Sequence, residues 1–218
     1  MQLTKFTHSC VRISDDLDRK LVVDPGAFSE VDEALDGIDA VLITHQHADH
    51  IDVARLTAAV AANPALKIWA PKDTVDQLAK IAVFEGRLTA VGPGESFVAG
   101  GLQVRTYGGQ HALIHSSVPM ISNVAYLIGD AIYHPGDSYT VPNAIVDTVL
   151  IPLNAPWAKV SETIDFTTAV RARQAFQIHD ALITEIGRNF YGGLVTRSTE
   201  LYGNTNFSQL DARQTVEL

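Results

Sequence analysis

The most unusual feature of this sequence is a short segment rich in side chains that bind metal ions. His45, His47, Asp49 and His50 lie within six residues of one another. Imidazole nitrogens and carboxylate oxygens suit zinc, manganese or iron, and a catalytic site leaves one coordination position open. His45 and His47 are two residues apart, so an extended backbone directs both side chains to the same side. One ion cannot easily take all four ligands from so short a segment, whereas two neighbouring ions could.

Strands and helices predicted on either side place this segment at a strand-to-helix turn. It follows a buried strand predicted over Ile38–Thr44 and precedes a helix predicted over Ile51–Ala62. Alternating apolar and polar residues predict a half-buried strand over Leu102–Tyr107. The other predicted strands are Leu3–Ile13, interrupted by the polar Thr7-His8-Ser9, Lys20–Gly26 with its closing turn, Leu66–Ala70, Asn123–Ile128, Ala131–His134, Asp147–Ile151 and Ala175–Ile178. The other predicted helices are Lys72–Ala82, Ser161–Gln174 and Ala181–Tyr191. The polar C-terminal stretch allows one more short strand, and we expect one domain over 1–218.

Composition restricts the class of protein. The chain has 218 residues, of which 46% are hydrophobic and 19% charged, so it can bury enough apolar surface to fold. No apolar run is long enough to span a membrane, and the first residues lack the apolar stretch of a signal peptide. The formal net charge of −9 argues against nucleic acid as a partner, because such binding depends on neutralising phosphates. The single cysteine, Cys10, is expected in the core and agrees with a cytoplasmic location.

The run Thr44-His45-Gln46-His47-Ala48-Asp49-His50 resembles the signature of the metallo-β-lactamase-fold superfamily, Thr-His-x-His-x-Asp-His. The resemblance covers nearly the whole chain, in the order of the family's later landmarks. A third histidine of that family follows a central strand, as His111 does here. Its bridging aspartate follows a short strand in a Gly-Asp pair, as Asp137 does, and its last histidine ends a late strand, as His179 does.

This resemblance implies both a fold and a ligand set. The implied fold is of the α/β class, a four-layer αβ/βα sandwich of two mixed β-sheets packed face to face with helices outside. The implied cofactor is a pair of divalent metal ions, zinc first, with manganese or iron as alternatives. One ion would be held by His45, His47 and His111, the second by Asp49, His50 and His179, and Asp137 would bridge both.

Two further runs resemble a narrower branch of the family. Thr7-His8-Ser9-Cys10 and Tyr133-His134-Pro135-Gly136-Asp137 are similar to small metal-dependent hydrolases related to ascorbate-6-phosphate lactonase. Thr7 stands where that branch usually has glycine. Oxygen-reducing di-iron proteins of the same fold carry glutamate in place of His47, so the histidine favours hydrolysis over redox chemistry.

Other polar residues near these motifs have two interpretations each. We predict Asp49 and His134 as catalytic residues, with His134 either donating a hydrogen bond or proton to the substrate or serving a structural role. His8 has the same two interpretations, with the structural one favoured. His115 would lie about 13 Å from His111 in an extended segment, too far to share an ion, so it would line the pocket or support the structure.

Three more side chains would support the centre from outside. Asp24 would orient a histidine ligand, or begin the Asp-Pro-Gly turn, or both. Asp180, next to His179, has the same two interpretations. Trp157 would form a pocket wall or anchor its loop against the core.

These observations favour a hydrolase that acts on a small anionic molecule. Divalent ions lower the pKa of bound water and stabilise developing negative charge, so an ester, lactone or phosphoester is the expected substrate. The alternatives are a phosphodiesterase or nuclease of the same fold and a metal-binding module without catalysis. We expect neither a nucleic acid nor a membrane as partner, and the sequence leaves a homo-oligomer open.

Overall fold

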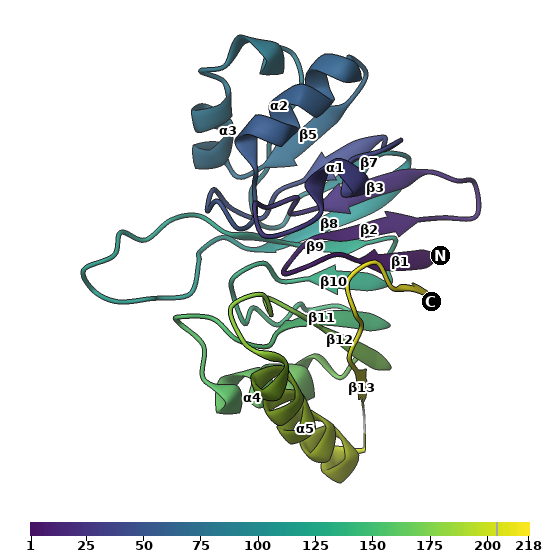
Figure 1. Cartoon of the computed structure of the whole chain (residues 1–218), viewed down its shortest axis with the longest axis vertical. Helices are drawn as coiled ribbons and strands as arrows, with labels where there is room; N and C mark the ends of the chain where they lie inside the picture. The colour runs from purple at the N-terminus through teal and green to yellow at the C-terminus, as the bar shows by residue number, and fades with distance from the viewer. Residues whose placement is uncertain (204) are drawn as a thin grey trace.

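Two seven-stranded β-sheets form the centre of the computed structural model, which describes residues 1–203 and 205–218 (Figure 1). The first sheet has the strand order β14-β1-β2-β3-β4-β5-β6 and the second the order β13-β12-β11-β10-β9-β8-β7. Both sheets are mixed, since β1 and β2 pair antiparallel while β3 and β4 pair parallel, and β9 and β10 pair antiparallel while β11 and β12 pair parallel.

The bounds of the elements are as follows. The strands of the first sheet are β1 (Gln2–Lys5), β2 (Val11–Ser14), β3 (Lys20–Val23), β4 (Ala40–Leu42), β5 (Lys67–Ala70), β6 (Leu88–Ala90) and β14 (Thr215–Glu217). Those of the second sheet are β7 (Ser96–Ala99), β8 (Leu102–Gly108), β9 (Val124–Ile128), β10 (Ile132–His134), β11 (Thr148–Pro152), β12 (Gln174–Ile178) and β13 (Asn206–Ser208). The helices are α1 (Val31–Ala34), α2 (Val53–Ala62), α3 (Lys72–Leu78), the 3-10 helix η1 (Ala82–Phe84), α4 (Val160–Val170) and α5 (Glu185–Tyr202).

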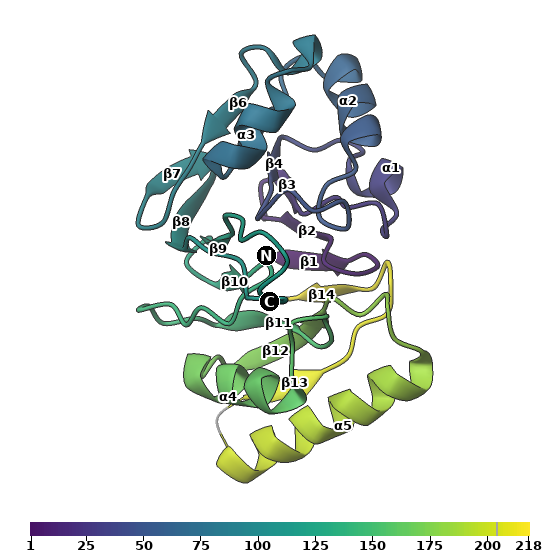
Figure 2. The ribbon, with the colours of Figure 1, turned by 90° about the vertical axis from the view of Figure 1, so that its left-hand side faces the viewer.

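The layers follow from three groups of buried apolar side chains. The group between the sheets draws Leu3 and Leu42 from the first sheet and Tyr126 and Phe176 from the second. A second group joins the first sheet to α1, α2 and α3 and includes Cys10, and a third joins the second sheet to α4 and α5. Figure 2 shows the helices outside and the sheets between them. The four-layer α/β sandwich predicted from the sequence is confirmed.

Burial along individual strands explains their sequence patterns. In β8 buried and more exposed residues alternate, as predicted, because only one face packs between the sheets. All five residues of β9 and all five of β11 are buried, because apolar groups cover both faces of these strands. Among the helices that the structure describes, none has the length and apolar character needed to cross a membrane.

The interruption predicted at Thr7-His8-Ser9 in the strand Leu3–Ile13 is confirmed, because His8 has a φ of 67° and the chain turns there between β1 and β2. Three predicted helices have wrong boundaries. The helix predicted over Lys72–Ala82 ends at Leu78, as α3. The helix predicted over Ser161–Gln174 ends at Val170, where Arg171 takes a left-handed conformation and closes it. The helix predicted over Ala181–Tyr191 begins later and runs further, as α5, with Thr184 capping its start.

Apart from His134, the last residue of β10, the candidate residues lie in connections at one edge of the two sheets. The turn between β1 and β2, the connections that follow β3 and β4, and those that follow β8, β10, β11 and β12 meet there. In Figure 1 this edge is on the left, where the connection between β8 and β9 projects, while both termini lie on the right. The carboxyl ends of parallel strands meet at one edge of a sheet, which is where binding sites of α/β proteins form.

Candidate metal centre

The first group of candidate ligands consists of three imidazoles, which we call the three-histidine cluster. His45 and His47 follow β4, and His111 follows β8. Their ligand atoms all lie within 4.8 Å of one another, and Nε2 of His45 is 3.1 Å from Nδ1 of His47. His45 is fully buried and His111 is nearly so, whereas His47 is partly exposed.

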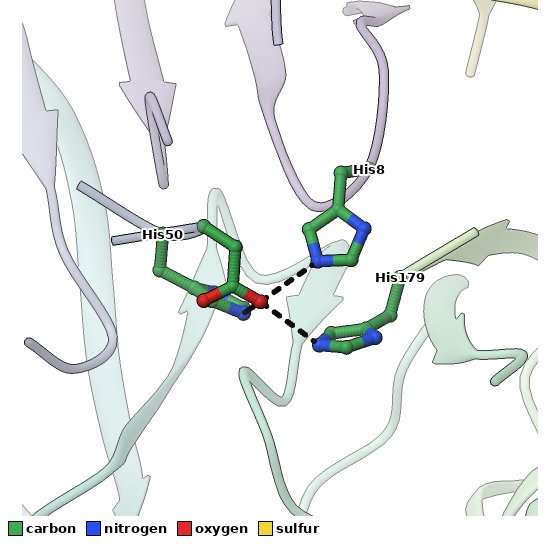
Figure 3. A group of neighbouring side chains, drawn as sticks. His8, His50 and His179 are labelled. Atoms are coloured by element: carbon green, nitrogen blue, oxygen red, sulfur yellow. Dashed lines mark hydrogen bonds and ion pairs between the residues drawn. The ribbon is translucent and has the colours of Figure 1, made fainter. Parts of the chain in front are cut away.

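The second group, which we call the Asp49 cluster, contains one carboxylate and two imidazoles. Asp49 and His50 come from the same turn before α2, and His179 follows β12. Oδ2 of Asp49 lies 3.6 Å from Nε2 of His179 and 3.8 Å from Nε2 of His50. The ring of His8 also belongs to this neighbourhood, as Figure 3 shows.

Asp137 lies between the two clusters. Its Oδ1 is 3.0 Å from Nε2 of His50, and its Oδ2 is 3.1 Å from Nε2 of His179 and 3.3 Å from Nε2 of His111. Because Asp137 faces residues of both clusters, its carboxylate could bind an ion in each cluster. The structure therefore brings together every residue that the family resemblance named as a ligand.

The ring nitrogens that face this point are unusual because they are buried and unpartnered. Within the described part of the chain, Nε2 of His50, His111 and His179 and Oδ1 of Asp137 have no hydrogen-bond partner. A buried polar atom left without a partner costs about 1–3 kcal/mol. A shared metal ion would supply the missing partner, because it binds the lone pairs of several imidazoles and a carboxylate at once. The donor set of nitrogens and carboxylate oxygens fits divalent ions of the zinc, manganese and iron type.

The second nitrogen of each of these imidazoles is held by an acceptor. His50 Nδ1 faces Oδ2 of Asp24, His111 Nδ1 the carbonyl of Ala112 and His179 Nδ1 the carbonyl of Asn154, each at 2.6 Å. In a neutral ring, an acceptor at Nδ1 keeps the proton on that atom, which leaves the lone pair on Nε2. The two carbonyls could not be predicted from the sequence, since a backbone acceptor leaves no signal in residue types.

Asp24 makes the contacts that an orienting carboxylate requires. It is fully buried, and besides His50 it accepts hydrogen bonds from the amide and the hydroxyl of Thr44, both at 2.7 Å. With its hydrogen given to Asp24, the Thr44 hydroxyl is free to accept from Nδ1 of His45 at 3.0 Å. Asp24 also begins the turn to Gly26, whose amide donates to its carbonyl at 2.8 Å. Asp24 therefore both orients His50 and begins the Asp-Pro-Gly turn.

The histidines of the two clusters differ in their pKa values and therefore in their charge. Burial lowers the pKa of His45 and of His47, so both rings are neutral near neutral pH. For His50, burial acts in the same direction, but the carboxylates of Asp137 and Asp24 outweigh it and raise the pKa. Burial opposes ionisation of Asp137, yet the neighbouring His50 and His179 hold its pKa well below the usual range.

The turn that carries Asp137 is shaped by Gly136 and Asn123. Gly136 has a φ of 61°, and a Cβ there would lie 2.2 Å from Oδ1 of Asn123 and 2.7 Å from Cβ of Thr44. The side chain of the buried Asn123 accepts from the amide of Asp137 at 2.9 Å and donates to the carbonyl of Pro135 at 2.9 Å. The sequence does not predict this role for Asn123, because its type and position resemble an ordinary strand start.

Trp157 contacts the candidate bridging residue directly. Its indole N–H donates to Oδ2 of Asp137 at 2.9 Å, and the ring packs edge-on against Tyr139 with centroids 5.0 Å apart. Only 9% of the residue is exposed. The sequence predicted Trp157 either as a pocket wall or as a loop anchor, and neither role involves this hydrogen bond to Asp137.

The catalytic role predicted for His134 is not supported by its surroundings. The ring is fully buried, with Nε2 donating to the carbonyl of Ser9 at 2.9 Å and Nδ1 accepting from the amide of Gly136 at 3.1 Å. With both nitrogens bonded to backbone, the side chain has no proton to offer a substrate, and the structural alternative fits. His115 is exposed and bonds to Ser117 in its own loop at 2.7 Å.

Asp180 faces away from the clusters. Its Oδ1 lies 3.2 Å from Nζ of Lys5, and its Oδ2 accepts from Nε2 of Gln177 at 3.1 Å. Lys5 is only 2% exposed, so this is a buried ion pair between β1 and the end of β12. Asp180 therefore holds the backbone beside His179 and does not orient its ring.

Comparisons with known proteins agree with this geometry. A family model described as a β-lactamase superfamily domain matches residues 2–179. The protein Rv0786c of Mycobacterium tuberculosis is 39% identical over 221 residues, which cover 99% of each chain. A UPF0173 metal-dependent hydrolase of Aeropyrum pernix is 30% identical over 138 residues, which cover 55% of this chain and 54% of that one. Among solved structures, the metallo hydrolase Igni18 of Ignicoccus hospitalis has a TM-score of 0.73 and 17% sequence identity, covering 99% of this chain and 97% of that chain.

Proposed function

This chain belongs to the β-lactamase superfamily, and from the geometry of its two clusters we propose that it is a metal-dependent hydrolase of a small anionic substrate. The observation that carries the proposal is the convergence of buried, unpartnered imidazole nitrogens on Asp137. The names of the relatives from Aeropyrum pernix and Ignicoccus hospitalis, which describe hydrolases that use metal, support it.

Two divalent ions would occupy this centre. The three-histidine cluster would hold one, the Asp49 cluster would hold the other, and Asp137 would contact both. When bound, such ions lower the pKa of water toward neutrality and stabilise negative charge on the reacting group. Zinc is the first candidate, and manganese and iron suit the same donors.

The side chains at the mouth of the centre decide how a substrate would reach it. His47 is partly exposed and the side chain of Asp49 is 21% exposed, whereas the other candidate ligands are buried. The substrate would therefore approach beside Asp49, which would orient the attacking water by accepting its hydrogen bond. We assign Asp49 this catalytic role in addition to its role as a ligand.

Charge favours a small anion as the substrate. The carboxylates of Asp49 and Asp137 would neutralise only half of the charge of two divalent ions, so the centre would be positive. The chain as a whole has a formal net charge of −9, which repels long polyanions but lets a small anion reach a focused positive site. A lactone, ester or phosphoester of a small acidic molecule fits these conditions.

The test begins with the metal content of the purified protein and of protein reconstituted with zinc, manganese or iron. Each form is then assayed on a panel of lactones and small phosphoesters, on bis(p-nitrophenyl) phosphate and on RNA at two salt concentrations. We expect close to two ions per chain and turnover of a small ester that chelation abolishes. RNA cleavage that falls steeply with salt would replace this proposal with a nuclease. Metal binding with no hydrolysis of any of these substrates would replace it with a metal-binding module.

A further inference from the structure

His8 lies close enough to the Asp49 cluster to be counted among its ligands. Candidate ligand atoms of His8, Asp49, His50 and His179 all lie within 4.8 Å of one another. Figure 3 shows the rings of His8, His50 and His179 around one carboxylate oxygen. Distance alone therefore does not say whether His8 would bind an ion or hold the residue that binds it.

Hydrogen bonds at the far side of each ring decide this question. A neutral imidazole has one N–H and one lone pair, so the partner at one nitrogen fixes the role of the other. His50 and His179 each give their Nδ1 proton to an acceptor, Oδ2 of Asp24 and the carbonyl of Asn154. In the neutral form that a metal ligand requires, these two rings therefore keep the lone pair on Nε2.

His8 has the opposite arrangement. Its Nδ1 accepts a hydrogen bond from the backbone N–H of Ala181 at 3.3 Å, and a backbone N–H can only donate. The ring proton is therefore on Nε2, which lies 3.1 Å from Oδ2 of Asp49. A doubly protonated ring is excluded by the same contact, because two N–H groups would then face each other. His8 thus offers Asp49 an N–H and has no lone pair to offer an ion.

The backbone around His8 is built to keep the ring in this place. His8 takes a left-handed conformation, with a φ of 67°, which is unfavourable for a residue with a side chain. Its carbonyl accepts from the amide of His179 at 3.2 Å, and the two rings pack with centroids 4.0 Å apart. The side chain is fully buried. His8 therefore connects the turn between β1 and β2 to the end of β12 on one side and to Asp49 on the other.

We propose that His8 is a positioning residue, whose Nε2–H holds the Asp49 carboxylate in place for the ion of the Asp49 cluster without binding that ion itself. This inference rests on the proposed function, because it assumes that Asp49 binds a metal. Partners that hold a metal ligand from outside typically affect metal affinity by about 10–100-fold. Removing the donor of His8 should weaken ion binding at the Asp49 cluster by that factor and leave the three-histidine cluster little changed.

Two substitutions separate a donor from a ligand. In His8→Gln the side-chain amide supplies an N–H in place of that of Nε2, whereas His8→Phe keeps a ring without any donor. Zinc affinities of both sites are measured by titration against a chromophoric chelator, with far-ultraviolet circular dichroism as the check on folding. His115→Gln, which changes an exposed histidine that bonds only within its loop, is the matched control.

We expect the zinc affinity of the Asp49 cluster to fall about 10–100-fold in His8→Phe and to recover most of the loss in His8→Gln. Loss of one zinc ion per chain in both variants would show that His8 is a ligand and overturn the inference. Unchanged affinities in both would overturn it as well, because the ring would then serve packing alone. Wild-type protein that binds no divalent ion would instead contradict the proposed function.

A measurement on the unaltered protein does not depend on how the variants fold. Long-range proton–nitrogen correlation spectra of the zinc-loaded wild type report which nitrogen of each imidazole carries the proton. We expect His8 with its proton on Nε2 and an unprotonated Nδ1 that zinc does not shift. A proton on Nδ1 of His8, together with a zinc-shifted Nε2, would overturn the inference.

Discussion

The two clusters of the centre lie side by side but differ in charge. The three-histidine cluster is made of imidazoles, and burial keeps those of His45 and His47 neutral. The Asp49 cluster combines a carboxylate with His50, whose pKa is raised by Asp137 and Asp24. Before any ion binds, the first cluster therefore presents lone pairs, while the second holds an ion pair that an incoming metal must break.

The clusters also differ in the sequence distance between each candidate ligand and the residue that orients it by a hydrogen bond. His45 is oriented by its neighbour Thr44, and His111 by the carbonyl of the next residue, Ala112. In the Asp49 cluster, His50 depends on Asp24 and Asp49 depends on His8, both from connections earlier in the chain. The Nδ1 partners of His45 and His111 thus come from adjacent residues, whereas those that hold His50 and Asp49 come from segments far along the chain.

The substitution Asp137→Asn should remove what the clusters share. It keeps the shape of the side chain but removes the negative charge that faces His50, His111 and His179. We expect turnover to fall by more than about 100-fold and the affinity for both ions to decrease, since the loss corresponds to several kcal/mol of charge stabilisation. Steady-state kinetics and elemental analysis measure the two effects.

The control for this substitution is Asp130→Asn. Asp130 is an exposed residue paired with Arg105 at 2.8 Å, and its positive φ suits asparagine. This variant should match the wild type in both measurements. Wild-type turnover and metal content in Asp137→Asn would show that the carboxylate has no role at the centre.

The substitution Asp49→Asn should separate the clusters. Because Asp49 faces His50 and His179 but belongs to only one cluster, we expect its loss to release one ion and leave the other. The metal content should fall from about two ions per chain to about one, with the affinity at the Asp49 cluster reduced at least about tenfold. Loss of both ions would mean that the three-histidine cluster does not bind a metal independently.

The parts of this centre that the sequence predicts are those with a local pattern. Apolar runs locate β4 and α2, and the turn between them contains His45, His47, Asp49 and His50 at short spacing. The fold and the later candidate ligands came from the order of landmarks in a family resemblance. The sequence left several contacts open because their partners lie far apart along the chain.

Two histidines illustrate that limit. His8 and His134 both lie in short sequence motifs. The partner of each ring nitrogen, however, depends on how segments far apart in the chain pack against one another. His134 bonds to the carbonyl of Ser9, which lies in the turn between two strands of the other sheet, so no spacing rule could predict that its proton is engaged. Similarly, the full length of α5 depends on buried contacts of Val195 and Thr199 that follow the glycine pair in its middle.

Acidity should affect the two clusters differently. In the metal-free protein the raised pKa of His50 means that this ring is protonated near neutral pH and must lose a proton to bind an ion. Ion affinity at the Asp49 cluster should therefore rise about tenfold per pH unit until pH passes that pKa. His45 and His47, whose pKa values are lowered, are already neutral, so affinity at the three-histidine cluster should vary less.

Calorimetric titrations in buffers of different ionisation enthalpy count the protons released with each ion. Between about pH 6.5 and pH 8 we expect about one proton more for the ion of the Asp49 cluster than for the other. Asp49→Asn, which retains only the three-histidine cluster, serves as the reference titration. Equal proton release for the two ions would contradict the difference in charge described above.

The smallest expected effect concerns Trp157, which touches the residue that both clusters share. Its indole N–H donates to Asp137, and Trp157→Phe removes this donor while keeping an aromatic ring. One lost hydrogen bond of about 1 kcal/mol corresponds to about a fivefold loss of metal affinity, shared by both ions. The matched control is Trp69→Phe, because the only other tryptophan stacks on Phe97 at a centroid distance of 5.7 Å and makes no contact with the candidate ligands within the described residues. The tryptophan emission of the protein should change on metal binding in the wild type and in Trp69→Phe, but not in Trp157→Phe, which retains only Trp69. If Trp157→Phe kept both the wild-type affinity and the fluorescence change, the hydrogen bond to Asp137 would have no part in holding the two clusters together.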